Sequence, residues 1–113
     1  MLLLIASITF GAILESTVHG KLVVDILSID KEGVTFKGKL GASLLKAENV
    51  KYVLLDEKRT DLIGKKGIHL TDGTIIYGEP VNISKDSGLV NHPHGVISLK
   101  LSDIVYFLSL IHI

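Results

Sequence analysis

The stretch that decides the fold is GIHLTDGTIIYGEPVNIS, residues 67–84. Apolar and polar residues alternate over 68–71, which is the pattern of a half-buried strand. Asp72-Gly73 is the strongest short signal for a β-hairpin, and a second, longer strand is expected over 74–83. Pro80 has no amide proton, so its strand must bulge there or lie at a sheet edge. This stretch therefore predicts two antiparallel strands joined by a tight turn.

The same pattern occurs twice in the chain. Residues 41–53 can be laid on residues 95–107 at an offset of 54 (95 − 41). One extra residue in the second copy is then expected near Gly33 and Gly88. The matched pairs include Leu45 and Leu99, Lys46 and Lys100, Val50 and Ile104, Tyr52 and Tyr106, and Asp25 and Glu79.

The repeat and the density of turns predict an all-β protein. We expect an apolar leader over 1–12, a first β unit over 13–55, a charged connection over 56–66 and a second β unit over 67–113. A unit of this size buries little apolar surface alone, so the two units should pack against each other. The connection, DEKRTDLIGKK, is expected to be a solvated segment or a single helical turn.

The second copy resembles the Sm-like small β-barrels. The resemblance lies in hydrophobic-x-Leu-x-Asp-Gly-Thr-x-x-x-Gly over 68–78, followed by Leu99-Lys100-x-x-x-Ile104. It implies a strongly bent five-stranded sheet in each of two tandem units. Members of this family commonly form rings and bind single-stranded RNA.

The resemblance also indicates where RNA contacts would lie. The family's Asp position falls on Asp30 and Ser84, and its Asn position falls on Val34 and Gly88. Its Arg-Gly position reads Lys46-Ala47 and Lys100-Leu101. The alternative reading is therefore a cytosolic RNA-binding or ring-forming protein, with candidate contacts at Asp30, Lys46 and Lys100.

Composition narrows the classes of function. Lys plus Arg equals Asp plus Glu, at 12 each among 113 residues, so no net charge favours nucleic acid or anionic lipid. The chain has no cysteine, which excludes thiolate chemistry and disulfides. It also has no tryptophan. It carries neither Gly-x-Ser-x-Gly nor a phosphate-binding glycine loop. We therefore expect a protein without enzymatic activity or cofactor.

His92-Pro93-His94 is the one metal-like feature. Two imidazoles one residue apart could share a metal ion, but a site needs further ligands. The sequence identifies no third ligand, so a polar hairpin loop is the main expectation. A small metal-binding or enzymatic protein centred on His92 and His94 remains a third reading.

The two ends of the chain are apolar. Met1–Ala12 carries no charge and is too short for an ordinary membrane-spanning helix, and it has the small residues of a secretory signal. We expect export to the periplasm or beyond. The alternative is a buried first strand or a hydrophobic helix of the fold, in a cytoplasmic protein. The run over 104–113, IVYFLSLIHI, is either a buried strand or an exposed edge for a partner protein or a second copy, through Ile104, Tyr106, Leu108 and Leu110. Together these features favour a non-catalytic binding or assembly module of the bacterial cell envelope.

Overall fold

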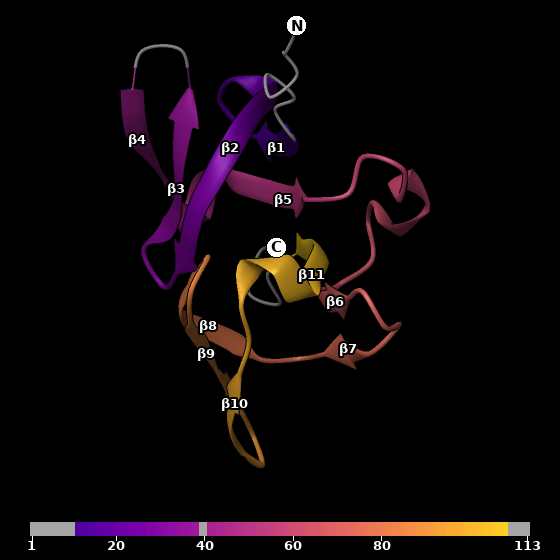
Figure 1. Cartoon of the computed structure of the whole chain (residues 1–113). Coiled ribbons are helices and arrows are strands. Elements are labelled where there is room, and N and C mark those ends of the chain that lie inside the picture. Colours follow the sequence, from indigo (N-terminus) through magenta and orange to yellow (C-terminus); the bar gives the residue numbers. More distant parts are fainter. Residues whose placement is uncertain (1–10, 39–40, 109–113) are drawn as a thin grey trace, which may run out of the picture.

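The computed structural model describes residues 11–38 and 41–108, and it confirms the all-β prediction. Within these two ranges, eleven strands form one antiparallel sheet, with three short 3-10 helices between them (Figure 1). The first strand set is β1 (Ala12–Ser16), β2 (Gly20–Asp30), β3 (Gly33–Gly38), β4 (Gly41–Lys46) and β5 (Val50–Leu54). The second strand set is β6 (Gly67–Leu70), β7 (Ile75–Ile76), β8 (Glu79–Ser84), β9 (Gly88–His92), β10 (Gly95–Ser98) and β11 (Ile104–Leu108). The 3-10 helices are η2 (Ala47–Asn49), η3 (Thr60–Leu62) and η4 (Leu101–Asp103).

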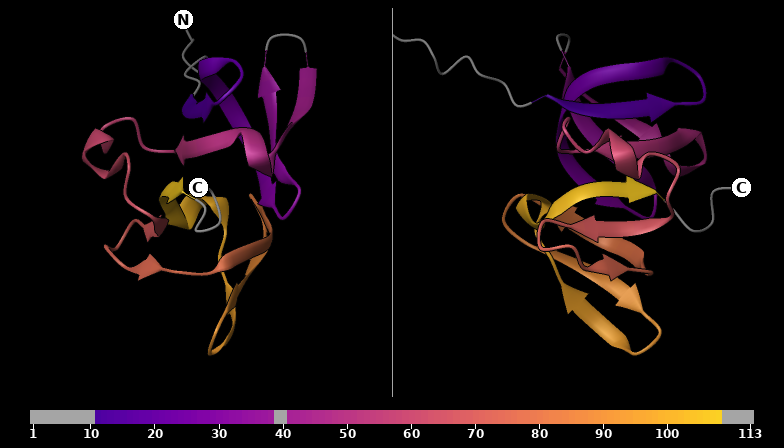
Figure 2. Two further views of the ribbon diagram at one scale, coloured as in Figure 1. Left: turned by 180° about the vertical axis from the view of Figure 1, so that it is seen from behind. Right: turned by 90° about the vertical axis from the view of Figure 1, so that its right-hand side faces the viewer.

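The sheet curls back on itself. Its main path runs β10-β9-β8-β2-β1-β5-β11-β6-β7, with β3 and β4 attached to the side of β2. β7 at one end of this path is separated from β8 by only Tyr77 and Gly78. The chain therefore brings the two arms of the path together, and the strands enclose a common interior (Figure 2).

Both strand sets have the same internal order. The first set is arranged β5-β1-β2-β3-β4, and the second is arranged β11-β6-(β7, β8)-β9-β10. η2 and η4 start 54 residues apart (101 − 47), as do β5 and β11 (104 − 50). The ladders also have register shifts at matching places, between Ile26 and Ser28 in β2 and between Pro80 and Asn82 in β8.

The prediction of one extra residue in the second copy near Gly33 and Gly88 is wrong. Ile29 lies opposite Val34, and Ile83 lies opposite Gly88, so the offset is 54 on both strands (88 − 34). Sequence alignment paired the two glycines because they are the same residue type. The hydrogen-bonded register instead places Gly88 at the position of Val34.

The hairpin over 67–84 forms, with two differences from the expectation. Leu70 and Thr74 close a three-residue loop, in which Gly73 takes a φ of 94° that favours glycine. The second strand is interrupted at Tyr77-Gly78, where a Cβ on Gly78 would lie 2.7 Å from the carbonyl oxygen of Asn91. The bulge predicted at Pro80 is confirmed by the register shift there.

The two strand sets meet in two antiparallel ladders. In the β2–β8 ladder Ile29 lies opposite Ile83, which is its own equivalent at the offset of 54 (83 − 29). In the β5–β11 ladder Val53 lies opposite Phe107, again its equivalent (107 − 53). The flanking pairs follow the same symmetry. Ser28 faces Ser84, and Asp30, the equivalent of Ser84, faces Asn82, the equivalent of Ser28. This register is that of a local two-fold axis, which we call the internal dyad.

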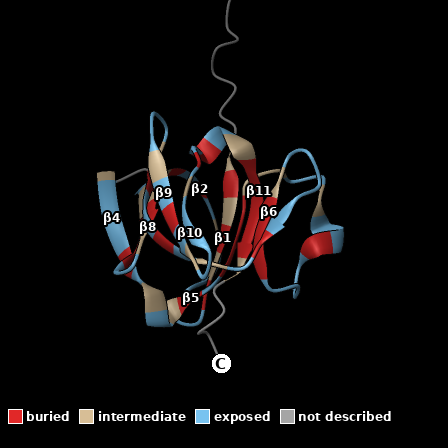
Figure 3. Ribbon diagram, turned by 90° about the horizontal axis from the view of Figure 1, so that it is seen from below, coloured by how far each residue is buried: buried red, intermediate tan, exposed pale blue. Residues whose placement is uncertain are grey.

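The main core lies inside the curl and combines both sets (Figure 3). Its fully buried side chains include Leu14, Ile29, Val34, Val53, Ile68, Ile83 and Val90. A second cluster lies on the other side of β5 and β11 and contains Tyr52, Leu54, Leu62, Val105 and Tyr106. Leu62 belongs to η3, so the charged connection folds as a helical turn and covers this cluster.

The prediction that Ile104 and Tyr106 form an exposed partner edge is wrong. β11 is paired with β5 on one side and β6 on the other, and both side chains are buried. The alternative of a buried strand applies to this segment. Leu108 ends β11 and is half-buried, and Leu110 lies outside the described residues.

The expected leader falls almost entirely outside the described residues, since these begin at Gly11. Ala12, its last residue, belongs to β1, where it is buried and lies opposite Val24. No helix in the part of the chain that the structure describes is long and apolar enough to cross a membrane.

Candidate functional site

The expected RNA contacts are divided between the two strand sets. Asp30 ends β2, and its Oδ1 accepts hydrogen bonds from the backbone N–H groups of Glu32 (2.8 Å) and Gly33 (3.2 Å). Gly33 lies opposite both Asp30 and Lys46, so these two residues share one end of the first set. The carboxylate of Asp30 is thus used to cap its own turn.

Lys100 lies at the matching end of the second set. It precedes η4, and its backbone N–H donates to Asp103 Oδ2 at 3.0 Å. A shallow surface hollow there is lined by Lys100, Asp86, Asn82 and Ser87, among others. Asp30 lines a different hollow, although it lies opposite Asn82 in the β2–β8 ladder.

His92 and His94 lie on the β9–β10 turn with ring centroids 5.3 Å apart. Nδ1 of His92 accepts the backbone N–H of His94 at 3.1 Å, which stabilises the turn. Among the residues that are described, no group of three or more His, Cys, Asp or Glu side chains could hold a metal ion.

Two hollows flank the internal dyad and are lined by equivalent residues. Lys85, Asp25, Leu101, Ile104 and Ile26 line one hollow. Lys31, Glu79, Ala47, Val50 and Pro80, their equivalents at the offset of 54, line the other. The two hollows differ in size, at about 620 Å³ and about 40 Å³, and we call them the open hollow and the closed hollow.

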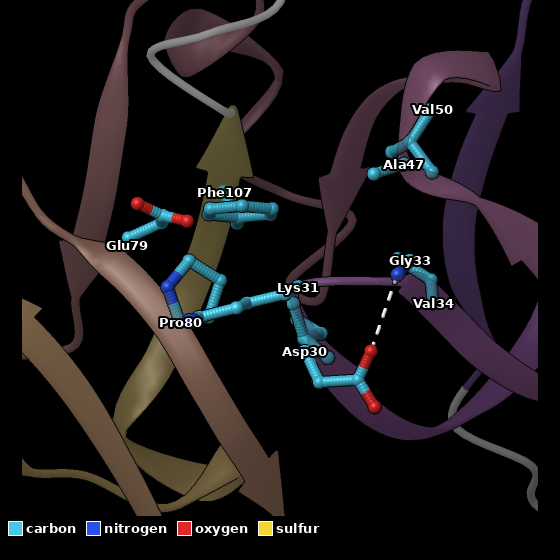
Figure 4. A pocket seen from close by; sticks show the side chains of 10 residues that line it. Asp30, Lys31, Gly33, Val34, Ala47, Val50, Glu79, Pro80 and Phe107 are labelled. Atoms are coloured by element: carbon cyan, nitrogen blue, oxygen red, sulfur yellow. Dashed lines mark hydrogen bonds between the residues drawn. The ribbon is translucent and has the colours of Figure 1, made fainter.

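The closed hollow is filled by its own walls (Figure 4). Phe107 and Pro80 lie on one side, Ala47 and Val50 lie on the other, and Lys31 extends between them. The phenyl ring of Phe107 takes up space at a position where the equivalent residue of the first set is the smaller Val53. The remaining volume is enough for a little water only.

The open hollow has an apolar floor and a polar rim. Ala12, Ile26, Leu101 and Ile104 are all buried side chains beneath it. The rim carries Asp25, Asp56, Lys85, Thr71 and Ser102. Lys85 Nζ lies 3.7 Å from Asp25 Oδ2, and both side chains are more than half exposed. The Oδ1 atom of Asp56 accepts the backbone N–H of Lys58 at 3.0 Å.

The outermost strands of the two projecting hairpins form a second kind of surface. Among the described residues, β4 is paired only with β3, and β10 only with β9. The two hairpins point in opposite directions in Figure 1. Leu44 on β4 and Val96 on β10 are 51% and 62% exposed. Natural edge strands are usually protected by charges, prolines or bulges, but Gly95–Ser98 carries none and Gly41–Lys46 only its terminal lysine. We call these two strands the free edges.

Neither a family model, nor a curated protein, nor a solved structure matches this chain. Asp25 and Glu79 are equivalent in the sequence repeat, but no sequence pattern predicted that either lines a hollow. Lys85 and Asp56 were missed entirely. Their neighbourhood depends on the β2–β8 and β5–β11 ladders, and no local sequence pattern specifies those ladders.

Proposed function

We propose that this protein is a non-catalytic binding or assembly module built from two tandem Sm-like small-barrel units, residues 13–55 and 67–113. The offset of 54 between η2 and η4 and between β5 and β11, the matching register shifts and the internal dyad support the duplication. The strand order of each set, with β7 and β8 together in the place of one strand in the second set, fits the sheet that the resemblance implies.

The observation that carries the binding function is the pair of free edges. An unpaired strand edge presents a row of backbone N–H and C=O groups that an extended segment can satisfy. The exposed Leu44 and Val96 add apolar contact beside those groups. The partner is an extended protein segment that pairs with β4 or β10 as an additional strand.

The place of action that fits this module is the bacterial cell envelope, reached through an apolar leader over 1–12. The uncharged run Met1–Ala12 supports this proposal. N-terminal sequencing of protein made in its native host tests it, because export with cleavage gives a mature end near Ala12. An intact Met1 would contradict cleavage.

The binding proposal is tested by placing a lysine on each free edge. Leu44→Lys and Val96→Lys, made together, add the charge that natural edge strands use to prevent pairing. Partners captured from the native host by the wild-type protein should be depleted at least about fivefold with this variant, measured by quantitative mass spectrometry.

Val18→Lys is the matched control, since Val18 is 62% exposed but lies in the turn between β1 and β2. It should retain the same partners as the wild type. Equal capture by the wild type and the edge variant would refute binding through the free edges.

A further inference from the structure

We propose that the open hollow is a binding site for a small organic cation, a protonated amine carried on an apolar body. This inference concerns a different surface from the free edges and does not depend on them. The volume of the open hollow, about 620 Å³, lies within the range of sites that bind small organic molecules.

The floor of the hollow selects an apolar body. Ile26, Leu101 and Ile104 contribute aliphatic side chains from β2, η4 and β11, and Ala12 contributes its methyl group from β1. These four elements come from both strand sets, so the floor is built by the sheet and not by a mobile loop. These floor side chains are themselves buried, and the half-buried Leu55 beside them keeps apolar surface exposed in the hollow. A short alkyl chain in the hollow would remove that apolar surface from water.

The rim of the hollow selects a positive charge. Asp25 and Asp56 supply two carboxylates, and Lys85 is the single cation among the described residues that line the hollow. The Lys85–Asp25 contact of 3.7 Å is long, and exposed pairs of this kind contribute little. A ligand ammonium can therefore take the place of Lys85 beside Asp25 and also interact with Asp56.

The closed hollow shows which feature matters. It keeps the same pair of charge types, with Lys31 in the place of Lys85 and Glu79 in the place of Asp25. Its volume of about 40 Å³ leaves no room for an alkyl chain. The internal dyad thus provides a natural control within one molecule, with similar charges at both hollows but space at only one.

The test uses hexylammonium as the probe, with 1-hexanol and hexanoate as neutral and anionic controls of the same length. Titrations are followed by amide chemical shifts in 1H–15N NMR spectra of the full chain. Hexylammonium should give saturable shifts confined to the lining of the open hollow, including Ala12, Thr71 and Ser102. Its dissociation constant should be about fivefold lower than that of 1-hexanol, and hexanoate should bind most weakly.

Substitutions at the rim make the proposal specific. Asp25→Asn and Asp56→Asn should each weaken hexylammonium binding about two- to fivefold, and Lys85→Gln should strengthen it by a similar factor. Glu79→Gln, the dyad-related counterpart of Asp25→Asn, should leave it unchanged.

Two results would overturn the proposal. One is equal binding of hexylammonium and 1-hexanol, which would show that charge is not recognised. The other is an equal loss of affinity in Glu79→Gln and Asp25→Asn, which would show that the open hollow is not the site. Either result leaves partner capture through the free edges unaffected, so the two proposals fail separately.

Discussion

Tyr52 is the residue whose surroundings most change its chemistry. Its hydroxyl donates to Glu15 Oε1 at 3.0 Å, and only 6% of the residue is exposed. Burial, followed by the hydrogen bond and charge of Glu15, raises the pKa of Tyr52 to about 12. Tyr106 lies beside it at a ring distance of 5.9 Å, and burial raises the pKa of Tyr106 as well.

These shifts predict a loss of stability in alkali. Between an unfolded pKa of 10.0 and a folded pKa of about 12, the unfolded chain releases a proton that the native Tyr52 retains. The free energy of unfolding should therefore fall by roughly 1–2 kcal/mol across this range, and full stability should be present below it. Urea unfolding at about pH 8 and about pH 11.5 measures the effect.

Tyr52→Phe should remove most of this alkaline loss, because phenylalanine has no proton to release. Tyr77→Phe is the matched control, since Tyr77 is 52% exposed. If the two variants lose the same free energy between the two pH values, Tyr52 is not the group responsible.

At the scale of elements, β11 is an interior strand of the sheet. It is paired on both sides, and it contributes Tyr106 to the second cluster and Phe107 to the main core. The hydroxyl of Tyr106 accepts the backbone N–H of Gly64 at 2.9 Å, which anchors the connection to the sheet. β10, by contrast, is paired on one side only.

Amide exchange should reflect this difference. The amides of β11 should exchange only on global unfolding, whereas those of β10 should exchange through local opening, at least about a hundredfold faster. Hydrogen–deuterium exchange followed by NMR makes the comparison within one sample. Equal rates in β10 and β11 would mean that β11 is not an interior strand in solution.

At the scale of the whole molecule, the internal dyad joins the strand sets into one cooperative unit. Ile29 and Ile83 lie opposite each other at its centre and are 1% and 0% exposed. Ile29→Ala and Ile83→Ala should each cost about 2–4 kcal/mol, and the two costs should agree within about 1 kcal/mol. Urea unfolding should remain a single transition in both variants.

The control is Val23→Ala, which removes a 74% exposed side chain and should change stability by less than about 0.5 kcal/mol. A separate early transition in either isoleucine variant would instead show that the strand sets unfold independently.

Local features of the fold could be predicted from sequence, and long-range ones could not. Alternation, turn residues and Pro80 predicted the strands, the hairpin over 67–84 and the bulge, because each depends on neighbours along the chain. Whether β11 is an edge or an interior strand depends on β5 and β6, which are distant in sequence. A charge-poor apolar run is compatible with an interior strand and with an exposed edge, so the sequence alone does not distinguish them. The structure shows an interior strand, and the prediction of an exposed edge was wrong.

The candidate site was harder to foresee than the fold. Asp25 and Lys85 become neighbours only through the β2–β8 ladder. The sequence around either residue contains no pattern that predicts this contact. Asp30 matched a binding position in the sequence, and the sequence did not indicate that its Oδ1 also caps its own turn.

The pairing of Val53 with Phe107 has a consequence for how such a protein can change over time. In a dimer of identical chains every mutation is made twice, so both symmetry-related sites gain or lose a property together. Here the two positions are encoded separately: Phe107 lines the closed hollow, whereas its equivalent Val53 does not line the open one, and the two hollows differ in volume. Two equivalent strand sets in one polypeptide can therefore diverge at one side of the internal dyad without the same change at the other.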